Sequence, residues 1–292
     1  MIVSLLLFFI ISIILSAVGL GGGAFYVPLL LALGYAFPLA SSTSLFLITV
    51  TGFSAFSRFQ RAKLVDWQLA VVMDTFTDVG AFVGGYTAVH FASHYLKIAL
   101  GVLLIIAAVF MLRMQGKQKK LHEPRQGFGY WQREFGEHRY SIFVPAIIPI
   151  TFTIGYLSGA LGVAGGLLKI PIMILWFSVP AKVAVATSSL MVGLTGLLGF
   201  SGHLFTGQIN WLLSIGVGAV VLVGGQIGSR ISIRLPAKRV KQVLAVVLVL
   251  IALWMIGRAV ENTDYDSLVQ CAGKGSSRHL VVDGGAYRFA RF

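Results

Sequence analysis

Residues 19–28 read GLGGGAFYVP, and a related stretch, GVAGGLLKIP, occupies residues 162–171. Both lie inside apolar regions, where a glycine costs about 1 kcal/mol relative to alanine in a helix interior. So much glycine predicts a break in each helix, and a break at membrane depth is tolerated only where it is buried in protein or lines a cavity. Transporters commonly place such breaks at matching positions of two internal repeats, with the substrate between them. The two stretches therefore predict a pair of broken helices around a shared site.

The composition is that of a membrane protein. Of the 292 residues, 57% are hydrophobic and 11% are charged, whereas a soluble domain carries roughly 25% charge. No stretch alternates in polarity as membrane β-strands do, so the expected fold class is all-α, a polytopic helical membrane protein. The net charge of +13 fits basic loops that orient the chain better than it fits nucleic-acid binding. The first segment has no basic n-region, which favours a spanning helix over a cleaved signal peptide.

Ten apolar segments are expected, and the first five correspond to the last five at an offset of 143 to 144 residues. The segments are 2–19, 22–35, 38–57, 66–91, 95–113, 141–161, 165–178, 181–201, 209–232 and 239–258. The matched positions include Pro28 with Pro171, Thr43 and Ser44 with Thr187 and Ser188, Thr51 with Thr195, Asp66 with Asn210, Trp67 with Trp211, and Gly80 and Gly84 with Gly224 and Gly228. Segments 22–35 and 165–178 are shorter than the roughly 20 residues of a full span. They either cross incompletely or join the preceding segment through the glycine break.

Two membrane repeats, residues 1–113 and 141–258, are expected on either side of a basic linker, 114–140. Lysine and arginine concentrate in short cytoplasmic loops, so the linker is expected to be cytoplasmic. Five crossings in each repeat then place the N-terminus outside and make the repeats inverted copies, as in many secondary transporters. Residues 259–292 form a polar tail without helical periodicity, which is expected to be disordered or peripheral.

The motifs GLGGGAFYVPLLLALG…SSTSL and GALGVAGGLLKIP…VATSSL resemble the sulfite exporter TauE/SafE family of membrane anion transporters. The resemblance covers about residues 1–257 and includes both halves. It implies transport of sulfite, organosulfonates or related small anions, generally across the bacterial cytoplasmic membrane. Two departures concern the second motif: Ala164 stands where the first has Gly21, and Lys169 stands where the first has Tyr26.

The glycine breaks are the first candidate binding groups. The free amides and the positive dipole end at a helix N-terminus form an anion site without a charged side chain. Such groups are expected from Gly21, Gly22 and Gly23 in one half and from Gly165 and Gly166 in the other. The alternative is that these small residues only allow close helix packing.

Four hydroxyl side chains follow the two prolines within apolar helices: Thr43, Ser44, Thr187 and Ser188. They are expected either to donate hydrogen bonds to the oxygens of a bound anion or to bond back to carbonyls of their own helix.

Three charged residues lie well inside apolar segments, away from their ends, where charge is costly and usually faces a cavity or the bundle interior. Lys169 is expected to be compensated by an anionic substrate, or else to snorkel to an interface. Asp74 and Asp78 are four residues apart and share a helix face. Two neighbouring carboxylates in an apolar setting favour retention of a proton, which suits proton coupling. Asp74 alternatively lies near the cytoplasmic surface.

The sequence therefore predicts a secondary transporter of small oxyanions, sulfite or organosulfonates, that works by alternating access and is coupled to an ion gradient. The alternatives are a passive anion channel and a carrier of other small anions such as carboxylates. An enzyme is not expected, and neither is a cofactor or a bound metal. The expected partners are a small anion and the lipid bilayer of the cytoplasmic (inner) membrane, with no nucleic acid, and the candidate assembly is a homodimer.

Overall fold

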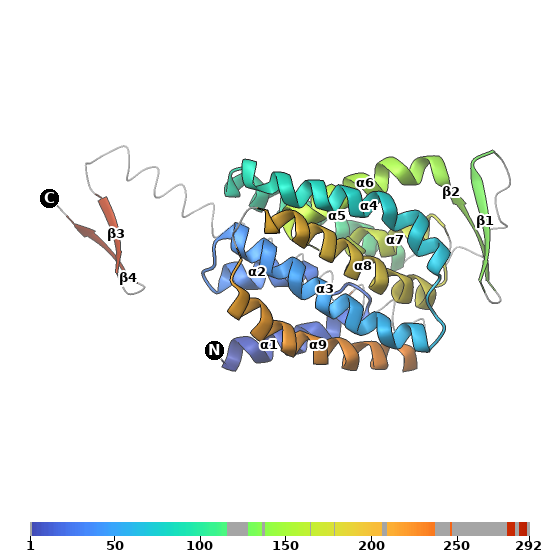
Figure 1. Cartoon of the computed structure of the whole chain (residues 1–292), viewed down its shortest axis with the longest axis horizontal. Coiled ribbons are helices and arrows are strands. Elements are labelled where there is room, and N and C mark those ends of the chain that lie inside the picture. Colours follow the sequence, from blue (N-terminus) through green and yellow to red (C-terminus); the bar gives the residue numbers. More distant parts are fainter. Residues whose placement is uncertain are drawn as a thin grey trace. The chain divides into compact units, whose positions relative to one another are not determined.

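The computed structural model describes residues 2–115, 128–135, 138–163, 165–177, 179–205, 209–236, 246, 279–283 and 286–290. The chain divides into two compact units, Met1–Ala252 and Leu253–Phe292. The first unit is helical, as Figure 1 shows. Its helices are α1 (Ile2–Ala17), α2 (Gly23–Ala32), α3 (Phe37–Arg61), α4 (Trp67–Thr87), α5 (Ser93–Gln115), α6 (Val144–Leu161), α7 (Gly166–Leu175), α8 (Ala181–Leu204) and α9 (Trp211–Arg234), with a 3₁₀ turn at Ala88–His90.

These helices confirm the prediction of a mostly helical fold. Each of the first nine expected segments contains a helix whose ends lie within a few residues of the expected ends. The tenth, 239–258, lies outside the described residues apart from Val246. Among the described residues, α3, α6, α8 and α9 are long and apolar enough to cross a membrane. The chain therefore contains the helices expected of a multi-pass membrane protein.

Matched residues begin the fourth helix of each half. The side chain of Asp66 accepts hydrogen bonds from the backbone N–H groups of Gln68 and Leu69 and so caps α4. The side chain of Asn210 accepts from the N–H of Leu213 and caps α9. Both residue types are preferred caps because a short polar side chain satisfies an N–H that has no partner within the helix. The two helices thus begin in the same way at equivalent positions.

The helices of the two halves are packed into one another. In Figure 1, α3 and α8 run through the middle of the bundle, where they pack on each other. Helix α4 packs on α6 and α8, and α9 packs on α1 and α3. Under the sequence offset, α1, α3 and α4 correspond to α6, α8 and α9, so these contacts are equivalent. Each half therefore lays its fourth helix against the first helix of the other half. The inverted orientation in the membrane stays a prediction.

The matched glycines allow these cross-half contacts to be close. A Cβ on Gly84 of α4 would overlap the carbonyl oxygen of Tyr156 on α6, and a Cβ on Gly228 of α9 would overlap that of Ile13 on α1. Small residues let helix backbones approach each other in this way in membrane proteins.

Two antiparallel hairpins were not expected from the sequence. Strands β1 (Tyr130–Phe135) and β2 (His138–Phe143) pair with Tyr130 opposite Phe143, so the end of the expected linker has regular structure. Within the second unit, β3 (His279–Asp283) pairs with β4 (Ala286–Ala290), in the tail for which disorder or a peripheral position was expected. The overlooked signal there is a pair of glycines between β-branched and aromatic residues, which favours a hairpin.

Candidate functional site

Both predicted helix breaks are present. Helix α1 ends at Ala17 and α2 begins at Gly23, while α6 ends at Leu161 and α7 begins at Gly166. The backbone φ angles are 77° at Gly19, 64° at Gly21, 90° at Gly22 and 71° at Gly162. Residues other than glycine rarely adopt these left-handed backbone conformations. The glycines are therefore required by the course of the backbone as well as by packing.

Two matched serines tie each break to the opposite half. The hydroxyl of Ser188 on α8 donates to the carbonyl oxygen of Gly19 at 2.9 Å and also lies 2.9 Å from that of Val185. The hydroxyl of Ser44 on α3 donates to the carbonyl oxygen of Gly162 at 2.6 Å. Ser44 and Ser188 are therefore already engaged with the breaks in this conformation.

The matched threonines differ from each other. Thr187 accepts a hydrogen bond from the backbone N–H of Asp66 at 3.0 Å. The hydroxyl of Thr43 is buried and has no hydrogen-bond partner. An orphaned hydroxyl in a protein interior costs free energy unless another group reaches it. Thr43 is thus the one of the four predicted hydroxyls that can accept a new partner without breaking an existing bond.

The two breaks lie next to each other, with Val192 of α8 between them. A Cβ placed on Gly166 would be 2.7 Å from Cγ2 of Val192 and 3.4 Å from the carbonyl oxygen of Gly19. A Cβ on Gly21 would overlap the other methyl group of Val192. Among the described residues, Val192 therefore fills the space between the breaks, where the shared site was expected.

A small cavity remains beside the second break. Its volume is about 10 Å³, and its lining includes Ser158, Val163 and Gly165. That is room for about one water molecule, which is too little for an oxyanion. In the described conformation, an oxyanion therefore has no room between the breaks at Val192 or in the cavity beside the second break, and this space must widen before an anion binds there.

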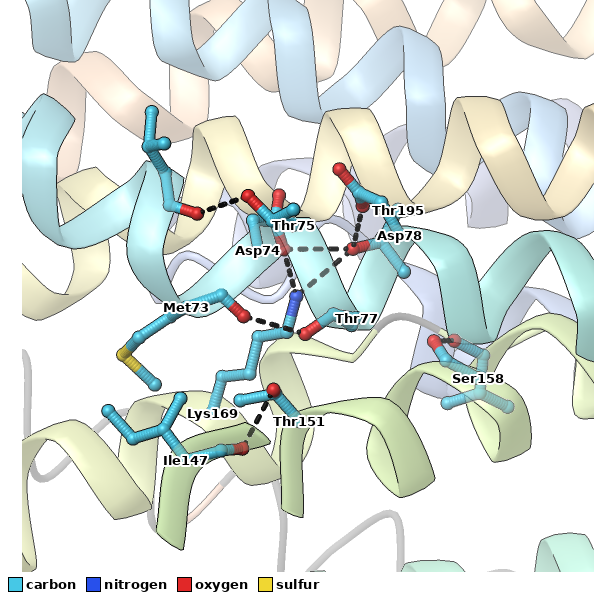
Figure 2. A network of polar contacts seen from close by, with 12 residues as sticks. Met73, Asp74, Thr75, Thr77, Asp78, Ile147, Thr151, Ser158, Lys169 and Thr195 are labelled. Carbon is cyan, nitrogen blue, oxygen red and sulfur yellow. Dashed lines mark hydrogen bonds and ion pairs between the residues drawn. The ribbon is translucent and has the colours of Figure 1, made fainter. Parts of the chain in front are cut away.

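Lys169 lies at the centre of a buried polar cluster, shown in Figure 2. Its side chain is fully buried, and its ammonium forms an ion pair with Asp74 of α4. It also donates to the hydroxyl of Thr195 on α8 at 3.0 Å. That hydroxyl oxygen lies 3.2 Å from Oδ1 of Asp74 and 3.1 Å from Oδ1 of Asp78. We call these four residues the Lys169 cluster.

The cluster gives Lys169 a partner that was not expected from the sequence. The expected alternatives were compensation by the substrate or snorkelling, whereas Asp74 pairs with Lys169 in this conformation. Asp74 is 2% exposed, and its depth relative to the cytoplasmic surface stays a prediction. The sequence does not show that α4 of the first half meets α7 and α8 of the second, and this contact is what brings the charges together. Thr195 was overlooked as a functional residue, although it appears among the matched positions.

The equivalent position in the first half carries a neutral version of the same arrangement. Tyr26, which matches Lys169, is buried with its hydroxyl 3.1 Å from that of Thr51, which matches Thr195. Each side chain also folds back over its own break. The ring of Tyr26 would overlap a Cβ on Gly22, and Cε of Lys169 is 3.3 Å from a Cβ on Gly165. The charged cluster is therefore built on a position common to both halves and is directly beside the second break.

The positions of the two carboxylates in the other half are uncharged. Gly218 and Leu222 of α9 stand where α4 has Asp74 and Asp78. Lys169 and the two aspartates thus meet at one of the two equivalent positions in the fold, and the matching position has uncharged residues. The two halves therefore differ chemically at this position.

A second ionic cluster lies where α4 begins and was not predicted. Arg133 of β1 donates to both carboxylate oxygens of Asp66, at 3.0 and 3.1 Å, and the hydroxyl of Tyr140 on β2 donates to one of them. Burial raises the pKa of Asp66, but the hydrogen bonds from Arg133 and Tyr140 outweigh it and hold the pKa below its usual range. The hairpin is thereby fastened to the cap of α4, which itself contacts α8 through Thr187.

Comparisons with known proteins agree with the motifs. The family model described as sulfite exporter TauE/SafE matches residues 4–255. The probable membrane transporter protein YunE of Bacillus subtilis (strain 168) is 30% identical over 251 residues, which cover 82% of this chain and 92% of the relative. The probable membrane transporter protein MJ0441 of Methanocaldococcus jannaschii is 25% identical over 264 residues, which cover 85% and 92%. No solved structure matches the chain. The family match extends across both halves and both glycine breaks, and the chain therefore belongs to the sulfite exporter TauE/SafE family.

Proposed function

We propose that this protein is a secondary transporter of small oxyanions, with sulfite and organosulfonates as its substrate class. The observation that carries the proposal is the meeting of the two helix breaks: α2 of one half and α7 of the other begin beside each other, separated by Val192. The first N–H groups of each helix have no partner within their own helix. Two positive helix ends that adjoin at one place favour a negatively charged ligand. The family membership and the transporter names of the relatives support the same conclusion.

The binding groups come from both halves. The backbone amides of Gly21, Gly22 and Gly23 and those of Gly165 and Gly166 supply hydrogen bonds to the anion oxygens. The unpartnered hydroxyl of Thr43 is the side-chain donor that is ready to join them. Lys169 supplies the positive charge, since its stem already lies against Gly165.

Transport follows from a change between closed and open arrangements. Val192 blocks the space between the breaks, so binding requires α8, together with the first break that Ser188 holds, to move relative to α7. The serine bonds cross between the halves, and each break therefore moves with the helix of the opposite half that holds it. If the breaks open to one side and then to the other, the site is exposed alternately, as in other transporters built from repeats. Asp74 and Asp78 are the groups that couple this change to an ion gradient.

The proposed location is the cytoplasmic membrane, with the linker 114–140 on the cytoplasmic side and the N-terminus outside. The β1–β2 hairpin then lies at the cytoplasmic end of α4. A homodimer is the proposed assembly.

Flux measurements in proteoliposomes test the function. Purified protein is reconstituted, and uptake of labelled sulfite and of a labelled alkanesulfonate is compared with uptake by protein-free vesicles. We expect saturable, protein-dependent uptake that unlabelled sulfite or sulfonate inside the vesicles accelerates by exchange. Equal flux with and without protein would refute anion transport, while large currents without exchange would identify a channel.

A matched pair of variants ties the flux to the breaks. Gly166→Val adds a side chain where a Cβ already meets Val192, whereas Gly216→Val adds one to α9 at a glycine with nothing within 4 Å. We expect the first variant to lose flux and the second to retain it.

A further inference from the structure

The hydroxyl of Thr195 has three polar neighbours but only one proton to donate. It lies 3.0 Å from the ammonium of Lys169, 3.2 Å from Oδ1 of Asp74 and 3.1 Å from Oδ1 of Asp78 (Figure 2). A threonine hydroxyl carries one proton to donate and two lone pairs to accept with. The ammonium uses one lone pair, so the hydroxyl can donate to only one of the two carboxyl groups. The other carboxyl group must bring a proton of its own if its contact is to be a hydrogen bond.

The ion pair decides which carboxyl group holds that proton. Asp74 faces the ammonium of Lys169 directly, and both side chains are almost completely buried. A buried charge without a partner is strongly unfavourable, so Asp74 stays ionised opposite Lys169. The proton then belongs to Asp78, which is only half-buried. The Lys169 cluster holds one positive charge, one negative charge and one transferable proton, and it is electrically neutral.

Other charged groups on the packed helices do not alter this count. Helix α6, which packs on α4, contains no Asp, Glu, Lys, Arg or His. On α8, His203 bonds the carbonyl oxygen of Gly159, and Lys182 lies near the other end and donates to that of Ile233. Within the described residues, the groups that face Asp74 and Asp78 are therefore each other, Lys169 and Thr195.

We propose that the transported anion displaces Asp74 from Lys169 and that the cluster takes up one proton for each anion. This inference rests on the proposed function and names its coupling ion. In the closed state, Asp74 occupies the lysine as a tethered substitute for the substrate. Its second oxygen, Oδ2, is buried without a hydrogen-bond partner, so the carboxylate is held through Oδ1 alone, by the ion pair that an anion would replace and by the hydroxyl of Thr195.

The proton balance follows from neutrality. When an anion pairs with Lys169, the freed Asp74 carboxylate is left without a counter-ion. Asp78 passes its proton to the oxygen of Thr195, and the hydroxyl proton of Thr195 passes to Asp74. Asp78, which is more exposed than Asp74 and Thr195, then regains a proton from water. One anion and one proton have entered, and the cluster is neutral again. Release on the other side reverses each step.

Stoichiometry measured in proteoliposomes is the test. Methanesulfonate is a suitable probe because it is monovalent and too strong an acid to carry its own proton. Labelled uptake and internal pH are recorded together, with the membrane potential set by potassium and valinomycin. We expect one proton to enter with each anion, accumulation when the outside is acidic, and a flux that does not change with membrane potential.

The outcomes separate this inference from the proposed function. Absence of protein-dependent flux of both methanesulfonate and sulfite would refute the proposed function. Flux without internal acidification, or flux driven by membrane potential or by a sodium gradient, would leave the carrier standing and overturn the proton-linked displacement.

Variants on α4 give a second test. In Asp78→Asn, the amide can donate to Thr195 as the protonated carboxyl does, but it has no proton to transfer. We expect this variant to keep part of its anion exchange and to lose accumulation driven by a proton gradient. Thr75→Val is the control, because Thr75 is exposed on the same helix and bonds only to the carbonyl oxygen of Val71. Proton-driven accumulation that survives in Asp78→Asn would overturn the proposal. Where that variant shows neither activity, the wild-type stoichiometry decides.

Discussion

Ser44 and Ser188 stand at equivalent positions of the two halves, and each donates a hydrogen bond to the helix break of the other half. Ser44 bonds the carbonyl oxygen of Gly162 at 2.6 Å, and Ser188 bonds that of Gly19 at 2.9 Å. The two breaks are thus held by reciprocal bonds between the halves, in addition to the bonds that each break makes within its own repeat. Any motion that opens one break must break or carry along its bond to the opposite half.

Removal of these bonds is expected to destabilise the closed protein. Ser188→Ala leaves the buried carbonyl of Gly19 without this donor, which costs about 1–3 kcal/mol. Ser189→Ala is the control, since Ser189 is also buried but bonds only to Ala186 of its own helix. The measurement is thermal unfolding in detergent. Equal melting temperatures for the two variants would contradict the role assigned to Ser188, and Ser44→Ala is expected to behave like Ser188→Ala.

The ion pair between Lys169 and Asp74 is expected to contribute both to folding and to transport. Lys169→Met leaves a buried carboxylate without its counter-ion, which costs about 3–5 kcal/mol. The double variant Lys169→Met/Asp74→Leu removes both charges and is expected to recover most of that stability, but not anion binding. Lys169→Ala is likewise expected to weaken binding.

Unfolding and sulfite binding, measured on the single and double variants, separate the two contributions. A double variant that is as unstable as Lys169→Met would contradict the pairing. Binding that is unchanged in a folded variant without Lys169 would remove the lysine from the anion site and leave the backbone amides as its donors.

The attachment of the β1–β2 hairpin is expected to depend on pH. Because the pKa of Asp66 is lowered in the folded protein, its contribution to stability is fully present above the ordinary aspartate pKa. It is lost as the pH falls through the lowered value, when the carboxylate is protonated and releases Arg133. Hydrogen exchange of residues 130–143 measures the attachment, and we expect protection at neutral pH that disappears in acid.

Asp66→Asn provides the matched variant for this attachment. An asparagine still caps the helix, as Asn210 does for α9, but it cannot form the ion pair with Arg133. We expect the variant to lose hairpin protection at neutral pH while α4 stays folded. Protection that is the same in Asp66→Asn and in the wild type would show that the ion pair does not fasten the hairpin.

Close approach of α4 and α6 is expected to depend on Gly84. In Gly84→Ala, the new methyl group overlaps the carbonyl oxygen of Tyr156, so the helices must separate and the protein should lose about 1–3 kcal/mol. Gly216→Ala in α9 meets nothing within 4 Å and should gain roughly 0.5–1 kcal/mol from the better helix propensity of alanine. Melting temperatures that move in the same direction in both variants would contradict this packing.

Local patterns were sufficient to predict the helices and the breaks. Glycine clusters at Gly19–Gly23 and Gly162–Gly166 identified where the helices stop, because that signal lies in the stretch itself. The counter-ion of Lys169 could not be found in the same way, since Asp74 lies 95 residues away and reaches the lysine only through the packing of α4 across the other half. The bond from Ser44 to the carbonyl oxygen of Gly162 in the other half could not be found from the sequence for the same reason.

The filling of the space between the breaks by Val192 could also not be predicted from the sequence. Val192 is an ordinary apolar residue of an apolar helix, and no local pattern indicates that its two methyl groups fill the space between Gly21 and Gly166. The repeat itself nevertheless contained a usable clue to the cluster. Thr195 matches Thr51, and the partners of these two threonines, Lys169 and Tyr26, match as well.

A density map of the full chain in nanodiscs, recorded with saturating sulfite and without it, tests the central claim most directly. We predict that bound sulfite lies between Gly21–Gly23 and Gly165–Gly166, that Val192 has moved out of this space, and that Asp74 no longer contacts Lys169. Sulfite bound elsewhere, while both breaks stay closed around Val192 in protein that still transports the anion, would contradict the account.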